Sequence, residues 1–185
     1  KNFDINRDGS INLLDAGKIY IAGLTLNNAD SLIKAKISNV YIGSEAFTSL
    51  INIRDVQIYI LGEASYPGLY TLNGNSNLLH ALSMAGGISE SGTFRQIQLK
   101  RNNKVIETID LYDLFIKGNY SSVSRLRTGD IIFVPPLKKL ASIYGGVNRP
   151  GEYELLDTDT FDNLIDYANG FASNVRPEGL IRIQP

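Results

Sequence analysis

The residues near the start of the chain have the types and the spacing of a calcium-binding loop. Oxygen-bearing side chains occupy the first, third, fifth, ninth and twelfth positions of one stretch, which are Asp4, Asn6, Asp8, Asn12 and Asp15. Gly9 stands at the sixth position, where such a loop turns sharply. Carboxylate and amide oxygens are the ligands that calcium prefers, so a calcium-binding module is the first hypothesis.

The residues that follow this loop favour a different structure. The loop resembles that of dockerin modules, in which a helix comes next and a second copy of the loop follows. Here Ile19 and Ile21 alternate with other residues, which is the period of a strand, and Gly17 and Gly23 disfavour a helix. We therefore expect a hairpin over residues 8–24, with Asp8-Gly9 as turn residues and no calcium binding. A dockerin-like calcium module stays as an alternative.

Little else in the chain has the pattern of a reactive site. His80 is the single histidine and lies off the apolar side of its expected helix, so we expect it to face solvent. Four carboxylates surround another expected helix. Asp157 and Asp159 flank its N-terminus, where negative charge is stabilised, and Asp162 and Asp166 lie on its outer face. The sequence therefore predicts no enzyme, no catalytic residue, no metal site and no cofactor.

The overall composition excludes further classes of protein. The chain has 185 residues, enough for one large or two small domains, and carries 18 Lys and Arg against 19 Asp and Glu. This balance argues against a non-specific nucleic-acid binder, which needs a basic surplus. There is no cysteine, and no apolar run reaches the roughly 18 residues of a membrane helix. Because the chain begins and ends abruptly, we expect it to be part of a longer protein.

The hydrophobic pattern predicts a helix and two strands before the middle of the chain. The helix covers residues 25–40, with Thr25 or an Asn as its N-cap. Its apolar stripe contains Leu26, Ala29, Ile33 and Ile37. Residues 47–53 and 56–63 are rich in β-branched and aromatic residues and read as strands.

The rest of the chain repeats itself with an offset of 83 residues. The segment that begins at Ile58 aligns without a gap with the segment that begins at Ala141, because 141 − 58 = 83. Identical pairs include Gly62 with Gly145, Tyr70 with Tyr153, and Ala85 with Ala168. An offset of this size is that of a small domain, so we infer a tandem duplication.

Both repeats have the same expected order of elements. A strand leads into a Pro-Gly turn, Pro67-Gly68 or Pro150-Gly151, which predicts a type II turn with positive φ at the glycine. A second strand and a helix follow. Gly86 and Gly87 end the first helix, and Asn169-Gly170 ends the second, because these residues tolerate the left-handed conformation. The expected N-caps are Asn75 or Ser76 in the first repeat, and Thr158 or Asp159 in the second.

The first repeat continues with a hairpin across Asn102-Asn103, a short helix over residues 110–118 and a closing strand after Gly129. The second repeat is cut after its helix and one more strand, residues 179–183. The fold class that these elements predict is α+β, with one helix across a small mixed sheet.

The first repeat resembles the soluble ligand-binding β-grasp domain, SLBB. The likeness rests on four motifs, Gly62-Glu63, Pro67-Gly68-Leu69-Tyr70, Ala85-Gly86-Gly87 and Gly129-Asp130 with the five residues that follow. The second repeat departs from them at Gly146, which replaces the Glu, and at Asn169, which replaces the first Gly of the pair. Neither change prevents the fold.

The residues before the repeats resemble the end of a polysaccharide export domain. The matching pieces are residues 8–14, residues 17–33 and the strands that follow. The resemblance implies three parts, which are a partial export domain at 1–54, a first SLBB domain at 55–137 and a truncated second SLBB domain at 138–185. This order is that of outer-membrane polysaccharide export proteins of Gram-negative bacteria.

The resemblance implies a non-catalytic role in the periplasm and outer membrane, in the export of capsule or exopolysaccharide. The implied partners are further copies of the protein in a ring, the polysaccharide and an inner-membrane polysaccharide co-polymerase, without nucleic acid. Tyr66 and Arg149 occupy the same exposed turn position of the two repeats, so we expect one or both to contact a neighbouring subunit or a glycan. The alternative is an SLBB module that binds a soluble ligand or glycan without forming a conduit.

Overall fold

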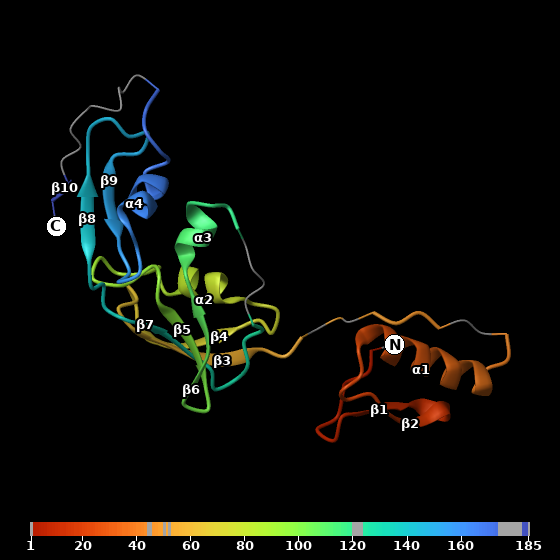
Figure 1. Cartoon of the computed structure of the whole chain (residues 1–185). Coiled ribbons are helices and arrows are strands. Elements are labelled where there is room, and N and C mark those ends of the chain that lie inside the picture. The colour runs from red at the N-terminus through yellow and green to blue at the C-terminus, as the bar shows by residue number, and fades with distance from the viewer. Residues whose placement is uncertain are drawn as a thin grey trace. The chain divides into compact units, whose positions relative to one another are not determined.

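The computed structural model describes residues 2–43, 46–49, 51, 53–119, 124–173 and 183–184. The chain divides into two compact units, Lys1–Asn52 and Ile53–Pro185, and each is described by itself (Figure 1). In the described part of the chain, the helices are too short or too polar to cross a membrane.

The N-terminal unit contains the predicted hairpin. Strands β1 (Ser10–Leu13) and β2 (Gly17–Tyr20) are antiparallel and are joined by a turn of 3-10 helix, η1 (Leu14–Ala16). A strand therefore stands where a calcium-binding helix–loop–helix would have its second helix. Ile11 and Ile19 lie opposite each other in the hairpin, and both are buried.

Helix α1 (Leu26–Val40) packs its apolar side on this hairpin. Thr25 caps the helix, because its Oγ1 accepts a hydrogen bond from the Asn28 N–H at 3.3 Å. Ala29 and Ile33 are buried, but Leu26 is exposed, so the predicted apolar stripe is one residue too long at its start. The strand predicted over residues 47–53 is wrong for the described residues 47–49, 51 and 53, which form no strand.

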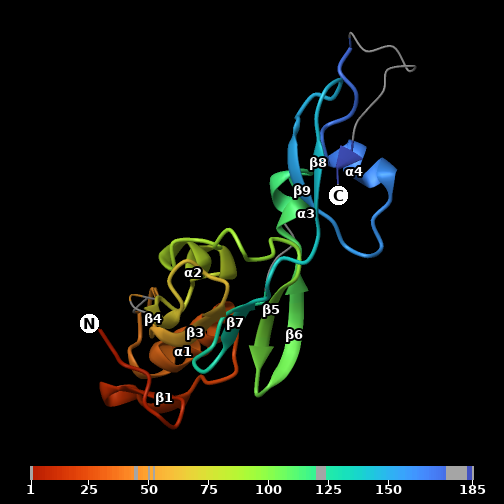
Figure 2. The same ribbon diagram turned by 90° about the vertical axis from the view of Figure 1, so that its left-hand side faces the viewer.

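The first repeat is a five-stranded mixed sheet in the order β4-β3-β7-β5-β6. Its elements are β3 (Val56–Gly62), β4 (Gly68–Leu72), α2 (Leu78–Met84), β5 (Ile97–Arg101), β6 (Lys104–Ile109), α3 (Leu111–Phe115) and β7 (Ile131–Val134). The pair β3–β7 is parallel and the other neighbours are antiparallel. Helices α2 and α3 lie over the same face of the sheet (Figures 1 and 2). The predicted α+β class with a β-grasp arrangement is confirmed.

The core of the first repeat lies between this face and the two helices. Alternate residues of β3, β4, β5 and β7 point inward, which is the pattern that buries one face of a sheet. Fully buried members include Ile58, Ile60, Leu78, Leu99 and Ile132. The hairpin β5–β6 turns at Asn102 and Asn103, which both have positive φ as a two-residue hairpin turn requires.

The second repeat contains β8 (Leu140–Ile143), β9 (Gly151–Glu154) and α4 (Phe161–Tyr167), and β8 also pairs with β10 (Ile183–Gln184). Ile143, Leu164 and Ala168 form the centre of its core. Most of the strand predicted over residues 179–183 lies outside the described residues.

The two repeats agree in detail at an offset of 83. The Tyr70 hydroxyl donates to the Tyr66 carbonyl at 2.6 Å, and the Tyr153 hydroxyl donates to the Arg149 carbonyl at 2.7 Å. The N-caps are also equivalent, but they are Asn77 and Thr160. The caps predicted at Asn75 or Ser76 and at Thr158 or Asp159 are therefore wrong by one or two residues.

The glycine whose left-handed backbone conformation the fold requires is Gly86, and not Gly68 as predicted. Gly68 and Gly151 are not among the glycines of positive φ, and each begins a strand, so the type II turns are wrong. Gly86 has a φ of +73°, and a Cβ built on it would lie 2.7 Å from Cδ2 of Tyr66. In the second repeat Asn169, with a φ of 60°, replaces this glycine, and Arg149 stands where the Tyr66 ring would be.

We therefore predict that Gly86→Ala lowers the free energy of unfolding by about 1–3 kcal/mol, through left-handed strain and the clash with Tyr66. The matched control is Gly68→Ala, which should change it by less than about 0.5 kcal/mol, because only Tyr70 Cε2, at 3.9 Å, lies near. Urea denaturation measures both. The double variant Tyr66→Arg with Gly86→Asn, which copies the second repeat, should recover much of the loss. Equal losses of stability for Gly86→Ala and Gly68→Ala would contradict the assignment of the strained conformation to Gly86.

Candidate functional site

Three of the residues with the spacing of calcium ligands, Asp8, Asn12 and Asp15, take part in the hairpin. The Asp8 carboxylate accepts hydrogen bonds from the Ser10 N–H at 3.1 Å and from Lys18 Nζ at 2.5 Å. The bond from Lys18 is the main reason why the pKa of Asp8 falls to about 2. Asn12 lies opposite Lys18 in the hairpin, and Asp15 accepts from the Tyr41 hydroxyl at 2.5 Å. Asp4 is exposed. Over the described residues, no three His, Cys, Asp or Glu side chains are grouped to hold a metal.

The other predicted positions divide into surface and interior. His80 is exposed, and its Nδ1 lies 2.9 Å from Ser76 Oγ. Asp162 and Asp166 are exposed on α4, as predicted. The prediction for Asp159 is incomplete, because its side chain is only 7% exposed and forms an ion pair within the protein.

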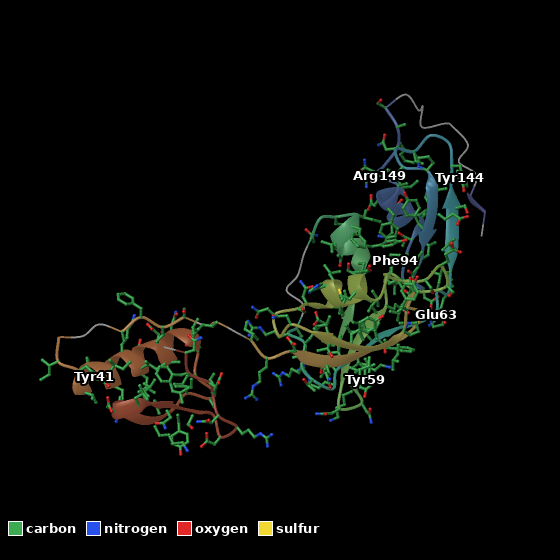
Figure 3. The ribbon with its side chains drawn as sticks, turned by 180° about the vertical axis from the view of Figure 1, so that it is seen from behind. Tyr41, Tyr59, Glu63, Phe94, Tyr144 and Arg149 are labelled. Carbon is green, nitrogen blue, oxygen red and sulfur yellow. The ribbon has the colours of Figure 1, made fainter. Side chains whose placement is uncertain are left out.

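Tyr66 and Arg149 are exposed at equivalent turns of the two repeats. Figure 3 shows Arg149 at the edge of the second repeat. In the first repeat the Tyr66 N–H donates to the Ala85 carbonyl, and in the second the Arg149 N–H donates to the Ala168 carbonyl. Each turn is thus fastened to the end of a helix, and its side chain is left to face outward. Their contact with a neighbour or glycan stays a prediction.

The most developed cluster of polar side chains joins the two repeats. Its centre is Arg95, which follows the loop after α2 and whose side chain is only 6% exposed. The guanidinium is paired with Asp110 of the first repeat, with Nε 3.0 Å from Oδ2, and with Asp159 of the second. Nη1 also donates to the Glu154 carbonyl at 3.3 Å. A buried cation is tolerated only with such partners, so each repeat supplies a charge that the Arg95 site needs.

Two adjacent tyrosine rings pack against the Arg95 guanidinium. The Tyr112 and Tyr167 ring centres each lie 4.9 Å from Cζ of Arg95, one from each repeat. The rings meet edge to face with their centres 5.2 Å apart. Guanidinium groups are attracted to aromatic faces, and the attraction is stronger away from water. The Arg95 site therefore combines ion pairing with aromatic packing.

Glu154 makes a second contact across the junction. Its carboxylate accepts from the Thr93 hydroxyl and from the Phe94 N–H, the latter at 2.8 Å, and its own N–H donates to the Tyr112 hydroxyl at 2.7 Å. Thr93 and Glu154 are both buried. Figure 3 shows Phe94 on the first repeat near the base of the second. No buried side-chain nitrogen or oxygen among the described residues lacks a hydrogen-bond partner.

The environment fixes the charge states of this cluster. Burial alone would raise the pKa of Asp159, but the Leu156 N–H and the Arg95 guanidinium outweigh it and hold this pKa below its usual value. Burial raises the pKa of Tyr112 to about 12. Burial opposes the charge on Arg95, yet Asp110 and Asp159 raise its pKa overall. At neutral pH Arg95 and Asp159 are thus ionised, and Tyr112 and Tyr167, whose pKa values are both raised, are neutral.

This junction has the chemistry of a structural joint. Its cation is already paired, its buried polar side-chain atoms are hydrogen-bonded and its central side chain is closed to solvent. The sequence pattern did not reveal Arg95, Glu154 or Tyr112, because their contacts across the junction join distant residues. Arg95 is 59 and 64 residues from Glu154 and Asp159, and Tyr112 is 42 residues from Glu154. The one local signal was Asp159 beside a helix start, where a carboxylate needs no distant partner.

Comparison with known proteins gives matches over most of the chain. Residues 56–134 and residues 140–181 each match the SLBB domain. The polysialic acid transport protein KpsD of Escherichia coli is 30% identical over 156 residues, which are 83% of this chain and 28% of that protein. The EPS I polysaccharide export outer membrane protein EpsA of Ralstonia solanacearum is 29% identical over 149 residues, 79% of this chain and 39% of that protein. The chain thus spans well under half the length of these relatives.

We predict that Arg95→Met loosens the junction. The change leaves Asp110 and Asp159 without their cation, and breaking a buried pair in this way costs about 3–5 kcal/mol. We expect a lower urea midpoint and faster tryptic cleavage at Lys138 and Lys139, which lie in the segment between the repeats. The control is Lys117→Met, which removes an exposed pair with Asp113, keeps both cleavage sites and should cost less than about 1 kcal/mol. If Arg95→Met were as stable as the control variant, Arg95 would not hold the two repeats together.

The low pKa of Asp159 predicts acid sensitivity. A carboxylate whose folded pKa is lowered adds stability above its unfolded value of about 3.9 and loses it as the pH falls through the folded value. Stability should therefore decline below about pH 4, and Asp159→Asn should flatten this part of the curve while lowering stability at pH 7. Thermal unfolding between pH 2 and 7 measures both effects. The control Asp162→Asn, at an exposed position, should follow the parent curve; identical curves for Asp159→Asn would refute the assignment.

The calcium hypothesis has its own test. We expect titration with millimolar calcium to give no binding heat, because Asp8 is engaged by Lys18 and the hairpin replaces the required helix. Saturable heat that disappears in Asp8→Ala would overturn the hairpin interpretation in favour of a calcium loop.

Proposed function

The chain belongs to the SLBB-domain family of polysaccharide export proteins, and from this premise we propose that it is a periplasmic, non-catalytic part of an outer-membrane exporter. The observation that carries the proposal is the closed junction around Arg95, which holds two SLBB domains in one arrangement. A conduit needs such fixed spacing between successive domains. A soluble-ligand module does not need it.

The names of the relatives support this role. KpsD is named as a polysialic acid transport protein, and EpsA as a polysaccharide export outer membrane protein. We extend to this protein the export of a capsule or exopolysaccharide and a place at the outer membrane, facing the periplasm. We also propose that residues 1–54 are the end of a polysaccharide export domain, that residues 55–137 form the first SLBB domain and that residues 138–185 belong to the second.

A ring is the assembly that this arrangement suits best. Two similar domains, fixed one after the other in each subunit, allow each level of a ring to be built from one type of domain. The contacts between subunits are then heterologous, and the ring closes by rotation. The partners in the proposal are copies of the protein itself, the polysaccharide and an inner-membrane polysaccharide co-polymerase.

The second candidate is an SLBB module that binds a soluble ligand or glycan without forming a conduit. The exposed Tyr66 is the observation that favours it, because an aromatic ring can stack on a sugar. The equivalent position in the second repeat is Arg149, so a shared sugar-binding role would require two different chemistries.

Gene deletion and oligomeric state test the proposal. Deleting the gene should leave polymer synthesis intact but remove the polymer from the cell surface. The complete protein, purified in detergent, should be a closed ring by electron microscopy. Normal surface display in the deletion strain, or a monomeric complete protein, would favour the binding-module alternative.

A further inference from the structure

The sheet of the first repeat has an apolar outer face. On the side away from α2 and α3, Tyr59 lies between Leu69 of β4 and Ile131 of β7 in the register of the sheet. Ile131 in turn lies opposite Lys100, and Phe133 lies opposite Leu61. Figure 3 shows Tyr59 on this side of the sheet, away from the second repeat. Tyr59 is 45% exposed and Leu69 is 56% exposed.

The second repeat shows that the fold does not require this apolar face. At the offset of 83, Tyr59 corresponds to Ser142 and Leu69 corresponds to Glu152. These two residues also lie opposite each other, and the Ser142 hydroxyl donates to Glu152 at 3.3 Å. An antiparallel sheet normally turns polar residues to water, as the second repeat does at these two positions. The apolar face of the first repeat is therefore the kind of surface that commonly serves as an interaction site.

The chemistry of this outer face is that of a protein contact with a positive rim. The centre is aliphatic and aromatic, and Lys100 lies over the Phe133 ring at 4.3 Å. The outward residues of β3, β4, β5 and β7 include no carboxylate. An apolar centre with a polar rim is the usual anatomy of a protein interface, and aromatic residues there carry much of the binding energy.

A surface of the opposite charge lies at the other side of the same repeat, at the end of α2. Tyr66, 70% exposed, packs its ring on Gly86, and Met84, 55% exposed, is the last residue of α2. The segments 63–67 and 83–92 are hydrogen-bonded to each other, and their charged residues are Glu63 and Glu90 alone. We call this surface the acidic corner.

We propose that the outer face of the first repeat docks on the acidic corner of the first repeat of a second copy of this chain. This inference rests on the proposed function, because it names the contact by which one level of the ring closes. Two different surfaces on opposite sides of one domain are what a heterologous contact needs. The apolar centres match, and the charges of Lys100 and of Glu63 and Glu90 are complementary.

The first test is to put the outer face of the second repeat on the first. The variant Tyr59→Ser with Leu69→Glu uses residues that the same strand pair accepts at positions 142 and 152, so the fold is preserved. In the complete protein we expect the concentration needed for assembly to rise about tenfold or more, measured by analytical ultracentrifugation. The control Tyr144→Ser removes an exposed aromatic residue from the second repeat and should leave assembly unchanged. Circular dichroism verifies that each variant is folded.

The second test uses the absence of cysteine from this chain. Leu69→Cys and Met84→Cys place thiols on opposite sides of the sheet, so a disulfide between them joins two copies rather than one chain. Mild oxidation of the double variant should give a ladder of linked subunits, and neither single variant should give one.

The proposal is wrong if the complete protein forms rings but shows neither the ladder nor the assembly defect; the exporter role then still stands. It is also wrong if the Tyr59→Ser, Leu69→Glu variant forms normal rings but no longer displays polymer, because the outer face then contacts the polymer or another partner. A monomeric parent protein overturns the exporter role itself.

Discussion

The arrangement of the two repeats depends on one buried cation. The Arg95 guanidinium is withdrawn from water and would be costly to bury alone, so it requires Asp110 from its own repeat and Asp159 from the next. The two adjacent tyrosine rings that pack against it exclude water and strengthen these ion pairs. Because the required charges belong to different repeats, the guanidinium is satisfied only when the repeats have one mutual position. A specific domain arrangement thus follows from the need to pair a charge.

The sequence predicted what is local and missed what is distant. The hairpin, the helices and the order of strands follow from alternation, from turn residues and from an 83-residue offset, all visible within short windows. Asp159 was placed correctly beside a helix start, but its pairing with Arg95 joins residues 64 apart and leaves no mark on the pattern. The backbone of Gly68 was also predicted wrongly, since Pro-Gly is compatible with a strand start as well as with a type II turn.

Because the two repeats are duplicates, a comparison of their equivalent residues separates those that folding requires from those that are free to serve a function. Features found in both repeats, such as the hydroxyl bonds of Tyr70 and Tyr153 to the turn before them, are required by the strand–turn–strand–helix plan. Features that differ have freedom to serve something else. Gly86 accompanies Tyr66 while Asn169 accompanies Arg149, in agreement with the steric clash that a Cβ at position 86 would make with the Tyr66 ring. The outer strand positions Tyr59 and Leu69 differ from Ser142 and Glu152 without such a reason, because these side chains lie outside the cores of the two repeats.

In the proposed assembly, the buried junction and the outer surfaces have complementary roles. A subunit that contributes to two levels of a ring must resist bending between its domains, because any change in their angle would misalign one level when the other closes. The junction supplies this resistance with interactions that are closed to solvent and directional, and it leaves the sheet face of the first repeat uncovered. The charges follow the same division. Arg95 is paired with Asp110 and Asp159 inside the junction, whereas Lys100 and Glu90 lie outside it, where they can select a partner. The energy of the fixed joint and the specificity of the contact between copies therefore come from different residues, so each can change without loss of the other.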